Sequence, residues 1–493
     1  MEYKNIVLFN VTIGSFMAVF DSNVVVISLP TIVNDLKTST FDALWVLMGY
    51  ILVLAVLLLA IGRLGDVYGR VRLYNLGFAV FTVGSLLCAV SLNGLMLVIF
   101  RLVQGAGAAL LFANSAAILT DAFPPNERGK AIGTNQVAGT AGSVLGLIAG
   151  GILTATPVIG WRAIFLVNVP IGVFATVWAY GQLHELSTPL RGEKLDPIGN
   201  LTFAGGLTLF LLGLTLGALA GFDIGDYGLM LVGLLLLAAF VLVERKITNP
   251  MMDISLFKNR MFAGGILSNF LAALARGAVS LVLVFYFQGP LHLDALTAGV
   301  LLIPFSVAFV ALGPVSGYLS DRYGARGLAT VGLVISGIAF LWFATITVTT
   351  PYSQLLIPMV LAGIGSGMFV APNIASIMNS VPPTRRGIAS GMSSTLVSAG
   401  VLLSLGVSFA IMATSVPLPV LQSIFAGLPG GQAVDVGPFM NAIHEIFIIM
   451  GIASFAAVLP SSLRGGRFVE TRVQAQDKLI TSGREVPVIS GGE

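Results

Sequence analysis

Apolar segments long enough to cross a lipid bilayer recur along most of this chain of 493 residues. A transmembrane helix needs about 20 such residues. Only 10% of the residues are charged, whereas about 25% is usual for a soluble domain. The sequence therefore predicts an all-α polytopic membrane protein with fourteen transmembrane helices, near residues 6–29, 43–62, 73–92, 95–119, 131–155, 163–183, 199–220, 227–243, 262–286, 296–319, 328–347, 354–378, 389–413 and 439–461.

Alternate loops between these spans carry most of the 25 lysines and arginines. Basic loops stay on the cytoplasmic side of a membrane, so both termini are expected in the cytoplasm. We expect a multi-pass protein of the plasma (inner) membrane that acts as a monomer in the lipid bilayer. The basic residues form no long block, which argues against a nucleic-acid partner.

Few residues are available for covalent or metal chemistry. Cys88 is the single cysteine, so an intrachain disulfide is excluded, and the three histidines lack metal-ligand spacing. We find no nucleophile–base pattern and no phosphate-binding Gly-Lys loop. The sequence thus predicts no enzyme activity, no metal, no cofactor and no ATP-driven transport.

Two loop motifs occur twice. The pattern that runs from Gly62 through Asp66 to Arg70 after the second span returns from Gly317 through Asp321 to Gly324 after the tenth. The pattern 124–129 returns likewise at 382–387. Parallel repeats of this kind are typical of transporters with a site between the halves. The predicted domains are an N-terminal six-helix bundle (1–185), a linker with two inserted helices (186–260), a C-terminal six-helix bundle (261–466) and a disordered cytoplasmic tail (467–493).

The motif from Gly62 to Arg72 resembles the loop motif of the major facilitator superfamily. Within it, the segments 21–30, 101–107 and 161–170 resemble motifs of the fourteen-helix drug:proton antiporters. The resemblance implies two bundles that rock around a central substrate site. One motif departs from the pattern: Leu147 stands where the antiporter signature of the fifth helix has proline, which leaves open whether transport is antiport.

The repeated loop motif is a candidate gate. The resemblance implies that its residues hold the cytoplasmic side shut in one state; the alternative is an ordinary charged loop that only fixes topology. The gate residues are Gly62, Gly65, Asp66, Gly69 and Arg70, with Asp321 and Gly324 in the second copy.

Charges inside the spans are costly and therefore candidates for function. Helix directions place Asp21 and Arg101 at similar depths, and likewise Arg276 and Glu445. The matched depths permit each pair to lie close together. Desolvation favours a protonated carboxyl and a nearby arginine favours the charged form, so alternating exposure can make Asp21 bind and release a proton. These four residues are the candidates for proton coupling; the alternative is that they are static pairs.

Neutral polar residues in the spans are candidates for lining a substrate cavity, although each can equally form an interhelical hydrogen bond. They are Asn23, Gln104, Asn114, Asn135, Gln136, Asn168, Asn269 and Asn373. The small residues Gly142, Gly146 and Gly150, followed by Gly151, form a smooth face for close helix packing. We expect this face to meet span 10 across the interface between the halves; the alternative is a contact within one half.

These observations predict a proton-coupled secondary transporter that exports small amphipathic or cationic compounds by alternating access. One alternative is a uniporter or importer of a metabolite such as a sugar, amino acid or peptide. The other is a membrane receptor that transports nothing.

Overall fold

The structure, a computed structural model, describes residues 2–124, 127–186, 196–247, 250–382, 385–426 and 435–464. The predicted tail 467–493 lies outside the described residues. Within those ranges the chain is built of helices and contains no strand. The all-α prediction is confirmed for this part of the chain.

Fourteen helices or helix pairs are long and apolar enough to cross a membrane, which confirms the predicted spans. The first six spans are formed by α1 (Tyr3–Leu36), α2 (Thr40–Tyr68), α3 (Arg70–Ala89), α4 (Gly94–Ala122), α5 (Arg128–Thr154), and then η1 (Gly160–Arg162), α6 (Ala163–Leu166) and α7 (Asn168–Gln182) together. The next two are α8 (Pro197–Ala220) and α9 (Ile224–Glu244).

The last six spans follow a short helix, η2 (Ile254–Lys258). They are formed by α10 (Arg260–Arg276) with α11 (Val279–Gln288), α12 (Ala295–Leu301) with α13 (Ile303–Tyr323), α14 (Ala325–Phe343), α15 (Tyr352–Asn379), α16 (Arg386–Ser415) and α18 (Gly437–Leu463). A further short helix, α17 (Leu418–Phe425), lies between α16 and α18.

Two of these spans are broken, and local chemistry explains each break. Between α10 and α11, a Cβ added at Gly277 would lie 2.8 Å from both Val401 Cα and Ser404 Cβ, so only glycine fits there. The Ser404 hydroxyl accepts the freed Ala278 N–H at 3.0 Å. Between α12 and α13, Pro304 follows Leu302 and has no N–H for a helical bond.

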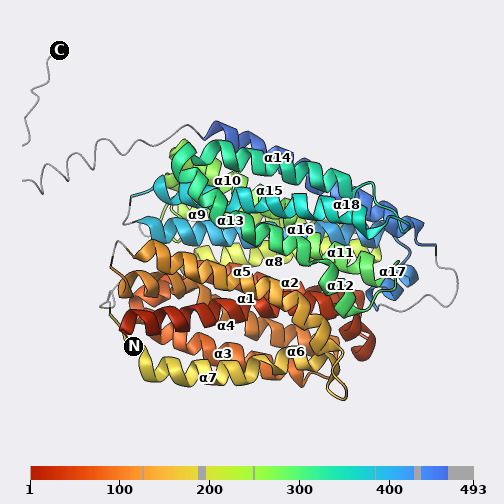
Figure 1. Ribbon diagram of the computed structural model, residues 1–493, viewed down its shortest axis with the longest axis horizontal. Helices are drawn as coiled ribbons and strands as arrows, with labels where there is room; N and C mark the ends of the chain where they lie inside the picture. The colour runs from red at the N-terminus through yellow and green to blue at the C-terminus, as the bar shows by residue number, and fades with distance from the viewer. Residues whose placement is uncertain are drawn as a thin grey trace, which may run out of the picture.

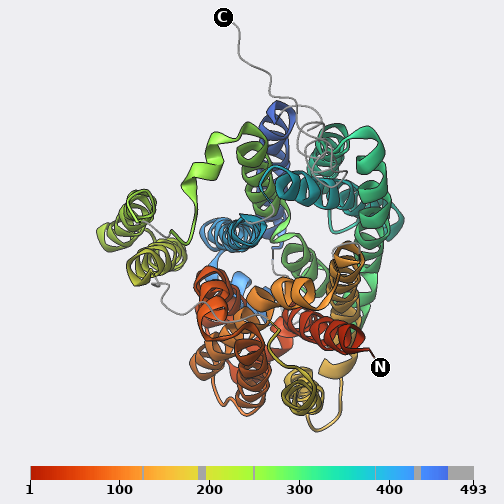
Figure 2. The same ribbon diagram turned by 90° about the vertical axis from the view of Figure 1, so that its left-hand side faces the viewer.

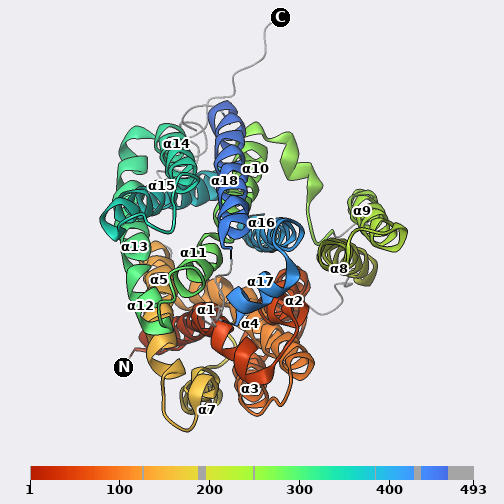
Figure 3. The same cartoon turned by 90° about the vertical axis from the view of Figure 1, so that its right-hand side faces the viewer.

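The two groups of six spans lie side by side as an N-terminal and a C-terminal half (Figure 1). The inserted pair α8 and α9 lies at the periphery, and α8 packs along α2 and α16, one helix from each half (Figures 2 and 3). A hydrogen bond joins α2 to α8, in which Trp45 Nε1 donates to Thr215 Oγ1 at 3.3 Å. The inserted pair thus packs on the seam between the halves.

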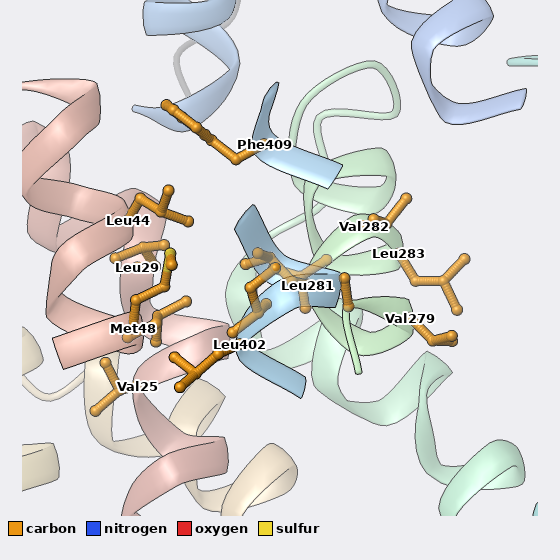
Figure 4. Packing of buried hydrophobic residues seen from close by; sticks show 14 of the residues in the cluster. Val25, Leu29, Leu44, Met48, Val279, Leu281, Val282, Leu283, Leu402 and Phe409 are labelled. Atoms are coloured by element: carbon orange, nitrogen blue, oxygen red, sulfur yellow. The ribbon is translucent and has the colours of Figure 1, made fainter. Parts of the chain in front are cut away.

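The largest apolar core joins both halves. Leu29 and Met48 of the N-terminal half belong to the same buried cluster as Leu281, Leu402 and Phe409 of the C-terminal half (Figure 4). Because lipid tails are as apolar as these side chains, close van der Waals packing and not removal from water stabilises this contact between the halves.

Contacts between the halves differ at the two ends of the molecule. One end, where α1 begins and α18 ends, is called the basic end because Arg70 and Arg464 lie there. At the opposite end, α5 packs against α12, and Gln288 Nε2 donates to Ile27 O at 3.0 Å. Towards the basic end, a Cβ added at Gly133 of α5 or Gly313 of α13 would meet nothing within 4 Å. Neither glycine is therefore packed against a neighbouring helix.

Candidate functional site

The side chain of Asp21 is the centre of a buried polar network in the N-terminal half. Its Oδ2 accepts from Arg101 Nη1 at 2.5 Å, and its Oδ1 accepts from Gln104 Nε2 and Asn168 Nδ2, both at 2.9 Å. Asp21 is 0% exposed and Arg101 is 1% exposed. The predicted proximity of Asp21 and Arg101 is confirmed, and Gln104 and Asn168 belong to the same network.

Arg101 also connects the network to α2. Its Nε donates to Val46 O at 3.1 Å, and its guanidinium lies 4.2 Å from the ring centroid of Tyr50, a cation–π distance. Ser85 of α3 accepts from Gln104 Nε2 at 2.9 Å and from Asn168 Nδ2 at 3.3 Å. Five helices, α1, α2, α3, α4 and α7, therefore meet around one carboxylate.

This arrangement can hold a charge inside a membrane, because an acid, a base and amide donors satisfy one another there. A proton added to Asp21 would cancel its attraction to Arg101 and leave the guanidinium without its acidic partner. Protonation of Asp21 would therefore weaken one link between α1 and α4.

The glycine face of α5 connects α1 to the rest of the N-terminal half. A Cβ at Gly142 or Gly146 would lie 2.7 Å from the carbonyl oxygen of Phe16 or Phe20, and one at Gly150 would lie 3.0 Å from that of Val24. Our prediction that this face meets span 10 is wrong, because these three glycines pack on α1 of the same half. Four-residue spacing reports a smooth face and does not identify the helix that covers it.

Gly151 makes the contact between the halves. A Cβ at this position would lie 2.3 Å from Leu296 Cα of α12. From the other side, a Cβ at Gly299 of α12 would lie 2.4 Å from the carbonyl oxygen of Leu147. Leu147, the residue that replaces the expected proline, therefore lies where α5 contacts α12 of the other half.

Arg276 and Glu445 are not paired. Among the described residues, no ion pair joins them, and the Glu445 side chain is exposed. Arg276 instead lines a small cavity of the C-terminal half with Ser336, Ser366 and Ser454, and its Nε is buried without a hydrogen-bond partner in the described part of the chain. The proximity that the sequence permits is not formed here, because similar depth does not fix the direction in which a helical side chain points.

The other cavity candidates divide into two groups. Asn114, Asn269 and Asn373 are buried in helix contacts; Asn269 Nδ2, for example, donates to Ser393 Oγ at 2.9 Å. Gln136 is exposed, and Asn23 and Asn135 are half-buried. The second group is therefore less buried than the first, and Asn135 Oδ1 is itself buried without a hydrogen-bond partner among the described residues.

The loop motif forms a charged cluster within the N-terminal half. Arg70 bonds Asp66 Oδ1 and Asp121 Oδ2, each at 2.8 Å. Glu185 accepts the backbone N–H groups of Val71 and Arg72 at 2.8 and 3.1 Å, which caps the start of α3. Sequence reasoning missed Asp121 and Glu185, although each lies at the end of a predicted span.

The motif glycines have separate roles. Gly69 and Gly324 adopt φ of +106° and +92°, a region that favours glycine, and they separate α2 from α3 and α13 from α14. Gly65 packs against Asn114 Oδ1, whereas a Cβ at Gly62 would meet nothing within 4 Å. The side chain of Asp321 lies outside the described residues.

Two bundles of six spans that touch at one end, with a buried charge network in one bundle, are typical of the class of secondary membrane transporters. The chain belongs to the major facilitator superfamily, since the model of that family matches residues 11–244 and 265–482. It is a transporter and not an enzyme, and it is a multi-pass protein of the plasma membrane.

Named relatives differ in their cargo. The chain is 34% identical to the riboflavin transporter RibZ of Clostridioides difficile over 80% of this chain and 85% of that protein. It is 30% identical to multidrug resistance protein 3 of Bacillus subtilis, over 90% of this chain and 86% of that protein. It is 28% identical to the tetracenomycin C resistance and export protein of Streptomyces glaucescens, over 97% and 87%.

A solved structure shares the fold. A bacterial homolog of the human lysosomal transporter Spinster, in an inward-facing and unoccupied conformation, aligns with a TM-score of 0.63 and 18% identity. The alignment covers 98% of this chain and 99% of that chain.

Proposed function

We propose that this protein is a proton-coupled exporter of small amphipathic or cationic compounds, of the fourteen-helix drug:proton antiporter type. The observation that carries the proposal is the buried carboxylate of Asp21, bonded to Arg101, Gln104 and Asn168. Burial of a carboxylate inside a membrane span is energetically unfavourable, and carboxylates that are found there commonly carry protons. The resistance and export protein of Streptomyces supports this direction of transport, and the multidrug resistance protein of Bacillus supports this class of substrate.

In this proposal the basic end faces the cytoplasm, as the distribution of lysine and arginine indicates. The molecule then has its outer side closed by the α5–α12 seam, and Asp66 and Arg70 form the cytoplasmic gate when the halves rock the other way. The 1–185, 186–260 and 261–466 segments act as two moving bundles and an inserted pair, within one monomer.

The coupling route runs through packed helices. Asp21 follows Phe20, whose carbonyl packs on Gly146 of α5. The same helix carries Leu147 and Gly151, which touch α12 of the other half. A proton that separates Asp21 from Arg101 can therefore change the fit of α1 on α5 and, through α5, the stability of the outer closure. A proton shifts this equilibrium only by its differential affinity for the two states.

Efflux of ethidium from cells tests the proposal, with and without a proton gradient. We expect gradient-dependent efflux in the wild type and background efflux in Asp21→Asn, in which the amide oxygen can still accept but the second oxygen is replaced by a donor and no titratable proton remains. The matched control is Glu445→Gln, which removes an exposed carboxylate from another span and should leave efflux intact. Loss in the control and survival in Asp21→Asn would move coupling to Glu445.

A second candidate function is transport of a metabolite, which the identity with a riboflavin transporter favours. Counterflow of labelled riboflavin in proteoliposomes separates the two candidates. Riboflavin exchange that persists when an ionophore collapses the proton gradient, without ethidium transport, would replace the export proposal.

A further inference from the structure

Two carboxyl side chains meet where the inserted helix pair reaches the basic end. Asp196 is the N-cap of α8, and Glu244 is the last residue of α9. They are 5% and 2% exposed. A Cβ added at Gly199 would lie 2.2 Å from Asp196 Oδ2 and 2.9 Å from Glu244 Oε1, so these two oxygens face the same point.

The hydrogen bonds of the four oxygens are incomplete. Asp196 Oδ1 accepts Gly199 N–H at 2.8 Å, and Glu244 Oε2 accepts Met252 N–H at 3.0 Å. Asp196 Oδ2 and Glu244 Oε1, the two that face each other, are buried and have no donor among the described residues. Two ionised carboxylates offer only acceptors, and a buried acceptor without a donor is costly. One proton placed between these oxygens satisfies both.

Among the described residues, no basic group replaces that proton. α9 packs against α8, from which Asp196 is the charged group that faces Glu244. The linker after α9 contributes backbone N–H groups of Met251 and Met252, and its Asp253 is paired with Arg385. Arg245 and Lys246, which follow Glu244, are exposed. In the described part of the chain, neither carboxyl has an ion-pair partner.

Helix ends decide which residue carries the proton. Asp196 lies at the N-terminus of α8, where the helix dipole stabilises an anion. Glu244 lies at the C-terminus of α9, where the dipole disfavours one. The neutral partner is therefore Glu244, whose Oε1–H donates to Asp196 Oδ2.

We propose that Asp196 and Glu244 hold one proton between them and form a proton-binding site separate from Asp21. A hydrogen bond connects this pair to the linker between the inserted helices and the C-terminal half, because Glu244 Oε2 accepts Met252 N–H. The next residue, Asp253, bonds Arg385 at 2.5 Å, directly before α16. Loss of the proton leaves two buried like charges and loosens the connection from Glu244 through the linker to α16. The pH at the basic end thereby regulates how the inserted pair packs between the two halves.

Thermal unfolding of the purified full-length protein across pH tests the site without any transport assay. A proton held by the native pair makes wild-type stability fall as pH rises through its release. In Glu244→Gln the new amide donates to Asp196 at every pH, and in Asp196→Asn it donates to Glu244. We expect both variants to fold. The Tm of the wild type should fall by a few degrees at alkaline pH, and the Tm of both variants should not show this fall. Asp226→Asn, which changes a half-buried carboxylate at the other end of α9, is the control and should keep the fall in Tm at alkaline pH.

Infrared spectroscopy supplies a second readout, since a protonated carboxyl has its own carbonyl stretch. We expect a band that disappears at alkaline pH in the wild type and in Asp21→Asn, and that is absent in Glu244→Gln and Asp196→Asn. Equal pH profiles and equal bands in wild type and both pair variants would overturn the proposal. So would a wild type stabilised by Na⁺ at the pair instead of by a proton. Failure of ethidium export alone would leave it standing.

Discussion

The two halves descend from one repeat but treat the same position in opposite ways. In the first half, Asp21 lies in an unbroken α1 and has three donors around its carboxylate. In the second half, the matching residue is Arg276, the last residue of α10 before a break, with a buried Nε that has no partner in the described part of the chain. At these positions the N-terminal half holds an ion pair, and the C-terminal half holds an arginine that has no acidic partner among the described residues and lies beside serines.

This difference separates two tasks. The N-terminal half surrounds one titratable group with five helices, while the C-terminal half has broken spans at Gly277 and Leu302 that fit against its partner. A bundle tied by a buried ion pair resists internal change, whereas short helices can adjust at the seam. Proton chemistry is therefore expected in the first half and local adjustment in the second.

The largest test of this comparison removes one arginine at a time. Arg101→Gln leaves Asp21 buried without its cation and should cost about 3–5 kcal/mol of unfolding free energy. Arg276→Gln removes a cation that has no acidic partner, so stability should change by less than about 1 kcal/mol or increase. Denaturation in detergent followed by tryptophan fluorescence measures both. Equal losses in the two variants would mean that Arg276 has an anionic partner in solution.

Removal of one amide from each half gives a smaller effect. Asn168 donates to a carboxylate, and hydrogen bonds to charged groups contribute about 1.5–3 kcal/mol. Asn269 donates to the Ser393 hydroxyl, a neutral bond of the kind that averages about 0.6 kcal/mol in membranes. Asn168→Ala should therefore lower the unfolding free energy by more than Asn269→Ala in the same assay. The reverse order would remove the special status of the Asp21 network.

How far the sequence predicts this site depends on what each pattern measures. Hydropathy predicts the spans because lipid demands continuous apolar helices, and depth along them correctly places Asp21 beside Arg101. Depth carries no information on the direction in which a side chain points, so similar depth permits a pair of Arg276 and Glu445 that the structure does not contain. Spacing identified the glycines of α5 but not their partner α1. Ser85 and Val46 O were missed, since a small hydroxyl and a backbone carbonyl leave no distinctive signal in an apolar run.

Valine substitutions at two glycines separate packing within a half from packing between halves. Gly146→Val forces α1 away from α5 and should destabilise the N-terminal half by about 1–3 kcal/mol. Gly299→Val meets the Leu147 carbonyl across the seam and should instead open the closed end. A cysteine placed at Leu281, in a Cys88→Ala background, reports this opening by faster labelling with a membrane-impermeant thiol reagent. Faster labelling in Gly146→Val than in Gly299→Val would contradict the assignment of the two faces.

The smallest effect concerns the caps of matching spans. Ser39 accepts Asp42 N–H at the start of α2, and Asp294 accepts Thr297 N–H and hydroxyl at the start of α12. The bonds from Thr297 hold the pKa of the Asp294 carboxyl below its usual value. The cap of α12 therefore stabilises the protein above the ordinary aspartate pKa of about 3.9 and is lost as pH falls through the lowered native value.

The Ser39 hydroxyl does not titrate, so acid should weaken the cap of α12 and leave that of α2 unchanged. Asp294→Ala should cost about 0.5–2 kcal/mol at neutral pH and less in acid. Asp294→Asn should keep most of the cap and lose its acid sensitivity. Unfolding of wild type and both variants at neutral pH and at about pH 3 measures the difference. Leu296 of α12 packs against Gly151 of α5 where the two halves touch. Titration of the α12 cap would therefore make the C-terminal half's part of this contact sensitive to acid, and not the N-terminal half's part.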